Sequence, residues 1–424
     1  MSFNIDQEIL LTMLSYLLAG ATLGPVVSQS FLDLMITLIF VCFIIDYSRN
    51  KYAYAPSFRK PFLFEYGFIL YPLLIIIGFF VLNITDTESW FRLYKFHWII
   101  NFYIFVWAFS RYEINLTKLL KFFSIAYLIP NFYAIAFTIY NNYWSLNPSN
   151  PNNTRLLGLL ESATYHAHAN GLILTFFLTV LFFQFKKLSS NYKTLCILAV
   201  LLMAIGIFLT FTRGVWLSLT LTILLFLLLH HRKLFFTVLA SGAILISGLY
   251  MYSASFRDRV EHSIQTKTAD SERWDLFDLH VKLFKDHPVF GIGYFNSLSH
   301  TPEATWSHYG YTTENRLNSH AHNQLLNVLS TTGILGLITF SLFYFWFLII
   351  NIRLTIKYKT EKLENLYILS VACLMTQLEF LIANLTDVGF EYTKIRSLIL
   401  LVWALVFCMW QNRVKISLSA PTRS

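Results

Sequence analysis

Long apolar runs recur from one end of this 424-residue sequence to the other. A bilayer contains no water to satisfy exposed backbone N–H and C=O groups, so a chain crosses it as helices of about 20 apolar residues. Runs near that length occupy residues 9–28, 31–46, 65–84, 95–110, 117–140, 167–185, 193–211, 214–230, 234–253, 333–352, 365–384 and 396–412. The sequence therefore predicts an all-α integral membrane protein with about twelve transmembrane helices.

The composition excludes an ordinary soluble domain, because 56% of the residues are hydrophobic, 13% are charged and the mean hydropathy is +0.55. More than half of the 32 lysines and arginines fall in alternate connections and near the C-terminus. Such residues mark the cytoplasmic side, which would also hold both termini of a multi-pass membrane protein. The net charge of +9 follows from this topology, so we expect membrane lipids and no nucleic acid as partners.

The predicted organisation has three parts. Residues 1–253 would form the first nine transmembrane helices, and residues 254–332 one large outer, periplasmic loop. Residues 333–424 would form the last three transmembrane helices and a cytoplasmic C-terminus. The four cysteines all fall within apolar runs, which predicts packing and no disulfide framework.

The large loop contains the stretch SERWDLFDLHVKLFKDHPVFGIGYF, which predicts a helix over about 271–286 that ends before Pro288. We expect this helix to lie on the bilayer surface or to cap the helical bundle. Four apolar side chains share one face at helical spacing: Trp274, Phe277, Val281 and Phe284.

Two arginines stand out as candidate anion ligands. Arg273 falls in the first turn of the loop helix, where the helix dipole opposes a cation unless an anion binds the same amide groups. The alternative is a simple ion pair with Asp270. Arg213, in LTFTRGVWLS, interrupts an apolar region between two membrane helices, and such a charge is expensive unless it faces water, a partner or an anion. The alternative is an arginine that extends to the membrane interface.

Histidines concentrate beside these arginines, because half of the 12 fall within residues 254–320. The stretch SHAHNQLLNVLSTTGILGLITF places His320, His322 and Asn323 directly before an apolar run. Transfer of a sugar from a lipid-linked diphosphate would need a base near neutral pH, positive charge for the departing diphosphate and a water-poor site. An arginine fork binds phosphate bidentately. His322, Arg213 and Arg273 are the best candidates for these tasks.

Metal sites are the alternative use of the same residue types. His166 and His168 lie in the Asn- and Pro-rich connection 145–170, for which irregular backbone is expected, and His320 and His322 repeat the same spacing. Imidazoles at i and i+2 share a face in extended chain and diverge on a helix. Two acidic pairs could hold a divalent ion, although short acidic pairs in loops are usually only solvated: Asp86 with Glu88, and Asp270 with Glu272. We expect no metal site.

The His-Asn pair belongs to a longer pattern. His322-Asn323 is followed after nine residues by Gly333-Ile-Leu-Gly336, which resembles the signature of the O-antigen ligase family within the O-antigen ligase/polymerase superfamily. TRGVWL around Arg213 resembles the family's arginine at an outer helix junction, and SERWDLF around Arg273 its arginine in the large periplasmic loop. The glycines would let helices approach closely.

The resemblance implies a membrane-embedded glycosyltransferase with a GT-C-like architecture that is inverting and needs neither metal nor cofactor. Its donor would be a glycan on undecaprenyl diphosphate and its acceptor lipid A-core, joined at the periplasmic face. By that analogy His322 activates the acceptor, Arg213 and Arg273 hold the diphosphate, and Asn323 and His320 lie in the substrate site. Asp387, in ANLTDVGFEY, resembles an acidic position that would orient His322 or an arginine.

Three other functions remain open. An O-antigen polymerase and a protein O-oligosaccharyltransferase belong to the same superfamily and use the same donor, and nothing in the sequence measures the acceptor pocket. A polysaccharide transporter or flippase would also place charges in the membrane, but it predicts paired broken helices in two related halves. No such internal repeat is visible in the sequence.

Overall fold

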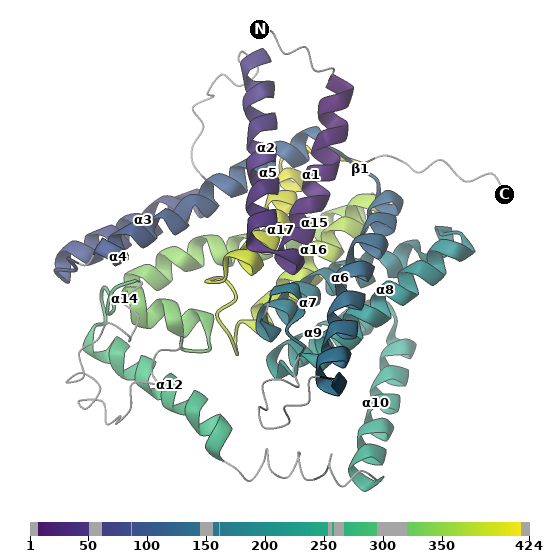
Figure 1. Cartoon of the computed structure of the whole chain (residues 1–424). Helices are drawn as coiled ribbons and strands as arrows, with labels where there is room; N and C mark the ends of the chain where they lie inside the picture. The colour runs from purple at the N-terminus through teal and green to yellow at the C-terminus, as the bar shows by residue number, and fades with distance from the viewer. Residues whose placement is uncertain are drawn as a thin grey trace.

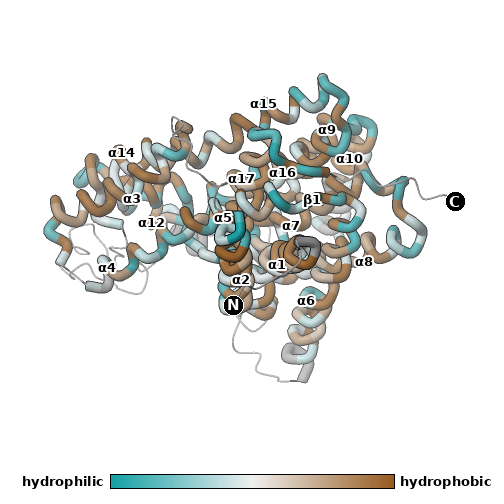
Figure 2. Tube along the Cα trace, turned by 90° about the horizontal axis from the view of Figure 1, so that it is seen from above, coloured by the Kyte–Doolittle hydropathy of each residue, from teal (hydrophilic) through white to brown (hydrophobic). Residues whose placement is uncertain are grey.

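The computed structural model describes residues 7–50, 62–85, 87–144, 156–160, 162–252, 257, 267–294 and 320–416. Within these ranges, ten helices are long and apolar enough to cross a membrane. Figure 2 shows hydrophobic residues along most of the helices and hydrophilic residues at several of their ends. The chain is an all-α integral membrane protein, which confirms the predicted fold class.

The first half of the chain forms a series of helices joined by short connections (Figure 1). They are α1 (Gln7–Val27), α2 (Gln29–Arg49), α3 (Leu63–Val81), α4 (Thr87–Phe91), η2 (Arg92–His97), α5 (Trp98–Arg111), α6 (Leu116–Trp144), η4 (Gly158–Leu160), α7 (Ala163–Gln184) and η5 (Phe185–Lys187).

The second half, after residue 189, is also helical. It contains α8 (Ser190–Leu209), α9 (Arg213–His230), α10 (Arg232–Tyr252), α12 (Lys267–Asp286), α14 (Gln324–Tyr344), α15 (Trp346–Thr360), α16 (Glu364–Ala383) and α17 (Thr393–Trp410). The strands β1 (Glu113–Ile114) and β2 (Lys415–Ile416) pair in parallel and bring the C-terminal segment beside the α5–α6 connection.

Each of the twelve predicted apolar runs is found in helix, but two runs lie outside the ten candidate spans. These are α5, which has only 14 residues, and α10. The helices α14 and α15 together form one 37-residue span. At 1.5 Å per residue it would be about 55 Å long, well beyond a hydrocarbon core of about 30 Å. The number twelve therefore stays a prediction.

Three helices form the centre of the bundle and position the candidate site (Figure 1). In the candidate spans α7 and α17, 78% of the residues are buried within the protein, and in α16 67% are. Helix α7 contacts α1, α6, α8, α9, α16 and α17. Because protein rather than lipid surrounds these helices, they can carry polar side chains whose hydrogen bonds are made inside the bundle.

Helix α14 bends at Gly333, whose φ of 67° and ψ of −170° are essentially restricted to glycine. A Cβ at this position would overlap the backbone of Val289, and the next residue, Ile334, donates its N–H to the carbonyl of Pro288 at 2.9 Å. The close contact at Gly333 is thus made between α14 and the turn after α12, and not between two membrane helices. The glycines were expected to bring helices together, and this one brings a helix and a turn together.

Helix α12 differs in two respects from the expected loop helix. It begins at Lys267 instead of about 271, so Arg273 is not in its first turn. The predicted position of Arg273 in the first turn of this helix is therefore wrong. Its inner face consists of Leu276, Leu279, His280 and Leu283, and His280 Nδ1 lies 2.6 Å from Ser330 Oγ of α14.

The predicted apolar face of α12 points outward, because Trp274 is 70% exposed and Phe277 is 40% exposed. Burying the leucine face against α14 while leaving large aromatic side chains uncovered is the arrangement expected of a helix that caps a bundle at a bilayer surface. The location of this helix at a bilayer surface stays a prediction.

Candidate active site

Three segments that are distant in sequence meet at the connection between α16 and α17. Gln324 donates its backbone N–H to the carbonyl of Asn384 at 2.9 Å, and Asn323 Nδ2 donates to the carbonyl of Leu385 at 3.3 Å. On the other side, a Cβ on Gly214 would overlap Thr386 Oγ1. The residues next to these contacts are His322, Arg213 and Asp387. The structure therefore gathers these three predicted site residues around one loop, residues 384–392.

Asp387 takes its principal partner from a fourth segment. Its Oδ2 lies 3.0 Å from Nε2 of His168, a residue of α7 that is 2% exposed. The other carboxylate oxygen, Oδ1, accepts the backbone N–H of Val388 at 2.8 Å and the hydroxyl of Tyr392 at 3.0 Å. A buried carboxylate with three donors is fully satisfied. Sequence reasoning noted His168 only as half of a His-x-His pair and did not predict this contact.

These contacts change the acidity of Asp387. Burial raises the pKa of the carboxyl, but the hydrogen bond and charge of His168, with the donors Val388 and Tyr392, outweigh it and lower the pKa to about 2. Burial and the neighbouring Asp387 charge raise the pKa of Tyr392, which keeps its hydroxyl protonated as a donor. The loop thus holds an ionised carboxylate beside an imidazole inside the protein.

The Asp387–His168 pair should contribute stability with a defined pH dependence. Because the folded pKa is depressed, the contribution is present above the unfolded value of 3.8 and is lost as pH falls toward about 2. Its size is on the order of 2 kcal/mol. We expect Asp387→Asn to lower the thermal unfolding temperature in detergent at pH 7, and the difference from wild type to persist at pH 4 and to shrink at pH 3 and below.

Asp278→Asn is the matched control for this prediction. Asp278 forms an exposed pair with Lys282 on α12, and exposed pairs contribute little. This variant should unfold near the wild-type temperature throughout. A constant difference between wild type and Asp387→Asn from pH 7 to pH 3 would contradict the assigned ionisation.

His322 lies outside α14 in an unusual backbone conformation. Its φ of 47° places it in the left-handed region, which non-glycine residues seldom occupy and which is found at functional sites. Asn323 fixes the residue that follows, because its Oδ1 caps α14 by accepting the N–H of Leu326 at 3.0 Å while its amide holds Leu385. The asparagine of the His-Asn motif is therefore engaged in holding His322 beside the 384–392 loop.

His320 lies on the same side of this loop. Its ring centroid is 6.1 Å from that of Tyr392, which in turn packs against Tyr165 of α7 at 4.7 Å. Since the Tyr392 hydroxyl donates to Asp387, the three rings form a wall next to the carboxylate. The structure thus brings His320 into the same neighbourhood as Asp387 and His168.

Arg213 is the first residue of α9, at the junction with α8, and it is exposed. The Thr212 side chain makes no capping hydrogen bond, and Phe211 has a φ of 53°, which makes the reversal between the two helices tight. The first amides of a helix and an adjacent arginine both favour an anion. The predicted location of Arg213 at a helix junction is confirmed.

Arg273 lies in α12, and its side chain falls outside the described residues. The same holds for the side chains of Asp270, Glu272 and Glu88, and for the whole of Asp86, so neither acidic pair is placed. The role of Arg273 therefore stays a prediction.

His166 and His168 do not share ligands. Both lie within α7, not in the irregular backbone expected for this connection, because the helix begins at Ala163. His166 Nε2 lies 3.2 Å from Asn170 Nδ2, whereas His168 faces Asp387. Side chains two positions apart on a helix diverge. Within the described part of the chain, no group of three or more potential His, Cys, Asp or Glu ligands lies together.

A buried polar group inside the bundle escaped sequence reasoning altogether. Glu379 of α16 is 0% exposed, and its Oε1 accepts the hydroxyl of Ser218 from α9 at 3.0 Å. A carboxyl group within a transmembrane segment is costly and is a functional candidate by default. Its position in a long apolar run was the signal that could have drawn attention to it. Glu379 lies eight residues before Asp387 in the sequence, and its hydrogen bond with Ser218 links α9 to α16.

A second polar cluster supports the loop from its other end. Gln324 accepts the N–H of Phe390 at 3.0 Å and its amide lies 3.4 Å from Glu391, which accepts the hydroxyl of Tyr294 at 2.7 Å. Arg396, 2% exposed, donates to the carbonyl of Phe390 at 3.2 Å. These bonds fix the loop against α14 and α17, so the position of Asp387 is set by a rigid frame.

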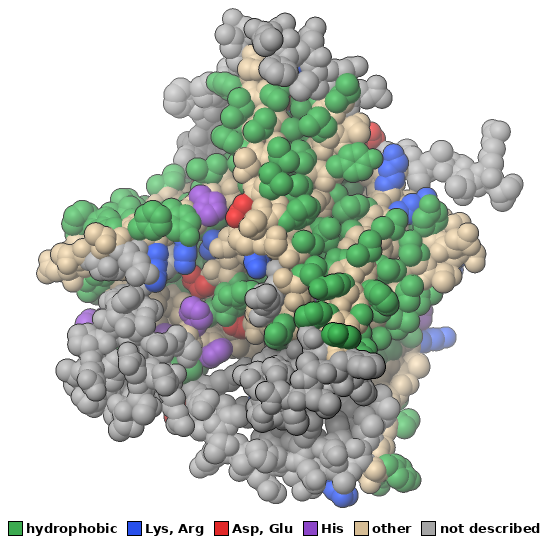
Figure 3. All heavy atoms as spheres, viewed as in Figure 1, with side chains coloured by type: hydrophobic (Ala, Val, Ile, Leu, Met, Phe, Trp, Pro, Cys, Tyr) green, Lys and Arg blue, Asp and Glu red, His purple; other side chains and the backbone are tan. Residues whose placement is uncertain are grey.

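The space-filling view shows where such residues gather. On the face in Figure 3, histidine, acidic and basic side chains collect in one area next to the hydrophobic surface of α1 and α2. Cationic and acidic groups at the border of an apolar surface suit a substrate with a charged head and a lipid tail.

Comparison with known proteins bears on the same region. A search of curated proteins finds no match. A protein-family model described as O-Antigen ligase matches residues 198–341, from α8 into α14. The match contains Arg213, Arg273, His322 and Gly333, and it ends before Asp387. The family comprises glycosyltransferase-like enzymes that act on lipid-linked glycans in a membrane. Over residues 198–341, about a third of the 424-residue chain, this membrane protein is therefore similar to the O-antigen ligase family.

Proposed function

We propose that this protein is an O-antigen ligase of the bacterial inner membrane. It would transfer a glycan from undecaprenyl diphosphate to lipid A-core at the periplasmic face, with inversion and without a metal. The proposal rests on one observation above all: His322, Arg213 and the Asp387–His168 pair come from four separate parts of the chain and meet around residues 384–392. A purely structural membrane protein has no need to gather these groups.

The proposed reaction uses His322 as general base. Its imidazole takes the proton of an acceptor hydroxyl while that oxygen forms a bond to the anomeric carbon of the donor. The bond between this carbon and the diphosphate oxygen breaks, and undecaprenyl diphosphate leaves with the bonding electrons. Proton removal by a positioned side chain contributes about 10²- to 10⁴-fold in rate.

The arginines would serve the leaving group. Arg213, at the start of α9, offers a guanidinium beside helix amides, and both stabilise the negative charge that develops on the diphosphate. We assign the same task to Arg273. Asp387 and His168 are proposed as positioning residues, because their pair fixes the loop on which Asn323 and Gln324 anchor the His322 backbone.

A reconstituted transfer assay tests the function. Purified protein is mixed with undecaprenyl-diphosphate glycan, with lipid A-core added or omitted and EDTA present throughout, and the products are separated on a gel. We expect glycan on lipid A-core only when that acceptor is present. Longer glycan on undecaprenyl diphosphate would instead mean a polymerase, and the absence of any covalent product would favour a protein acceptor or a transporter.

Arg213→Lys should impair transfer although it keeps the positive charge. An ammonium group cannot reproduce the two parallel hydrogen bonds of a guanidinium, and each hydrogen bond to a charged group contributes about 1.5–3 kcal/mol. We expect a decrease of about 10- to 100-fold in kcat/KM for the donor. Arg232→Lys, at the first residue of α10, is the matched control and should behave as wild type. Equal kinetics of the two variants would mean that Arg213 only extends to the membrane interface and does not bind the donor.

A further inference from the structure

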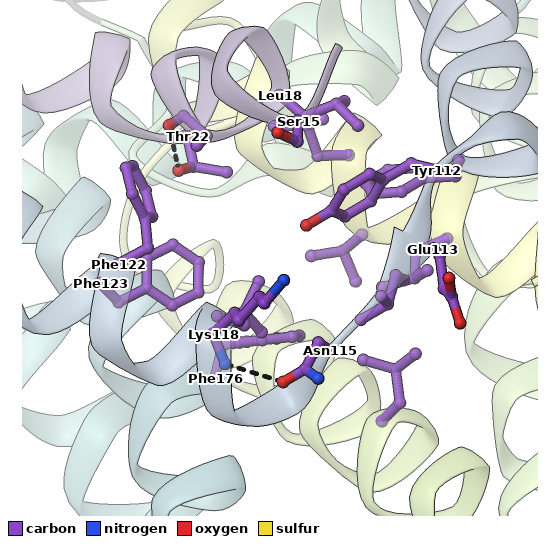
Figure 4. A pocket seen from close by; sticks show the side chains of 18 of the residues that line it. Ser15, Leu18, Thr22, Tyr112, Glu113, Asn115, Lys118, Phe122, Phe123 and Phe176 are labelled. Atoms are coloured by element: carbon purple, nitrogen blue, oxygen red, sulfur yellow. Dashed lines mark hydrogen bonds between the residues drawn. The ribbon is translucent and has the colours of Figure 1, made fainter. Parts of the chain in front are cut away.

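A cavity of about 780 Å³ lies between α1, α6, α7, α16 and α17 (Figure 4). Its lining extends from Arg111 at the end of α5 and Lys118 at the start of α6 to Leu172 in the middle of α7. Its volume falls within the roughly 300–1,000 Å³ typical of ligand pockets. The proposed transfer reaction does not use it.

The depth of the cavity matches half a bilayer. Its wall on α1 extends from Leu11 to Thr22, and a helix rises about 16 Å over that distance. The hydrocarbon core is about 30 Å thick. The cavity therefore reaches through one leaflet, from the membrane surface at the Lys118 end to the middle of the membrane.

The deep end is closed and apolar. Phe123 of α6 packs edge-on against Phe176 of α7 with centroids 6.1 Å apart, and Tyr127 donates its hydroxyl to the carbonyl of Thr22. The next polar group along α6 is Asn131, bonded at 3.0 Å to Asn170. The residues that line the cavity include none of His168, Asp387 and His322, so the cavity is not part of the candidate active site as described above.

The mouth carries a small excess of positive charge. Arg111 pairs with Asp46 at 3.1 Å, so their charges offset each other. Glu113 also lines the mouth, opposite Lys415 in the β1–β2 pair. Lys118 and Lys415 are exposed and make no ion pair within the described residues. Two lysines and one glutamate leave a single net positive charge around an opening that also presents the polar side chains of Tyr112 and Asn115 (Figure 4).

We propose that this cavity binds one anionic phospholipid from the leaflet at the Lys118–Lys415 end. An acyl chain lies along the apolar walls formed by Leu18, Phe122 and Leu401, and the phosphate lies between the two lysines. A lipid tail is already in hydrocarbon before it enters, so the apolar walls supply little preference for one lipid over another. Selectivity must come from the headgroup at the mouth.

The charge at the mouth gives a quantitative expectation. A lysine near an anionic headgroup contributes about 1 kcal/mol, which is about fivefold in affinity. Native mass spectrometry of the purified full-length protein would measure retention of phosphatidylglycerol and of phosphatidylcholine with identical acyl chains. We expect one phosphatidylglycerol per protein, bound about fivefold more tightly than phosphatidylcholine, in line with the single net positive charge at the mouth.

Three variants locate the binding. Lys118→Gln with Lys415→Gln should abolish the preference between the two lipids, whereas Lys186→Gln with Lys359→Gln, two exposed lysines outside the cavity, should preserve it. Ser15→Trp places a large ring in the cavity and should prevent retention of either lipid although both lysines remain.

Two outcomes would overturn the proposal. Unchanged preference for phosphatidylglycerol in the variant with Lys118→Gln and Lys415→Gln would show that these lysines do not select the lipid headgroup. Both lysines are exposed, so we expect the variant to fold normally. Unchanged lipid retention in a correctly folded Ser15→Trp protein, as judged by its size-exclusion profile and its transfer activity, would place the lipid elsewhere on the protein surface.

Discussion

His322→Ala is expected to abolish glycan transfer while leaving the protein folded in the membrane. Removal of a general base costs about 10²- to 10⁴-fold in rate, and the imidazole is only partly buried. The backbone at this position has a φ of 47°, which alanine tolerates less well than histidine, so the purified variant should be checked for an unchanged unfolding temperature. The measurement is kcat in the reconstituted assay at saturating donor and acceptor.

His287→Ala is the control for this substitution. His287 is an exposed histidine in the turn after α12 and is not among the residues around the 384–392 loop. It should retain full activity. Turnover near the wild-type rate in His322→Ala would remove His322 from the mechanism, and the base would then have to be sought among His320 and His168.

Gly333→Ala should produce the largest structural effect. Its φ and ψ cost a non-glycine residue about 1–3 kcal/mol, and the new Cβ would overlap the Val289 carbonyl, so the contact between α14 and the turn after α12 must open. We expect destabilisation of about 3 kcal/mol or more. Because α14 begins directly after His322, the shift would also displace the candidate base. A lower unfolding temperature in detergent, together with reduced kcat, would record both effects.

Gly242→Ala provides the matched comparison within the same chain. Gly242 lies in α10, and a Cβ there would meet no heavy atom within 4 Å. Alanine favours helix over glycine by about 1 kcal/mol, so this variant should be as stable as wild type or slightly more so. If Gly333→Ala unfolded at the same temperature as Gly242→Ala, the bend in α14 would not need glycine.

Much of the fold could be predicted from periodicity and apolar length. Every predicted apolar run is helical, because in lipid a backbone can satisfy its hydrogen bonds only within the segment itself. Helix ends were less certain: α7 begins at Ala163 and not at 167, and α12 begins at Lys267 and not at 271. Those differences matter, since they place His166 and His168 on a helix and remove Arg273 from a first turn.

The contacts of the candidate site likewise include some that could be predicted from the sequence and some that could not. Arg213 and His322 could be found because a charge at a helix junction and a His-Asn pair before an apolar run are local patterns. The partner of Asp387 could not be found in this way, because His168 lies 219 positions away in the sequence. The local sequence does not distinguish His168 from several other histidines. Glu379 was visible as an acid in an apolar run, but its contact with Ser218 depends on how α9 and α16 pack.

The sequence by itself determined that this chain is a helical membrane protein and which residues are candidates for acid–base and anion-binding chemistry. Both follow from local properties, namely the transfer free energy of each segment and the functional groups of each side chain. Only the tertiary structure decided that Gly333 bends α14, that Asn323 fixes His322 beside the α16–α17 connection, and that His168 pairs with Asp387. Those relations depend on side-chain packing between helices far apart in sequence, and no local pattern encodes a distance between them.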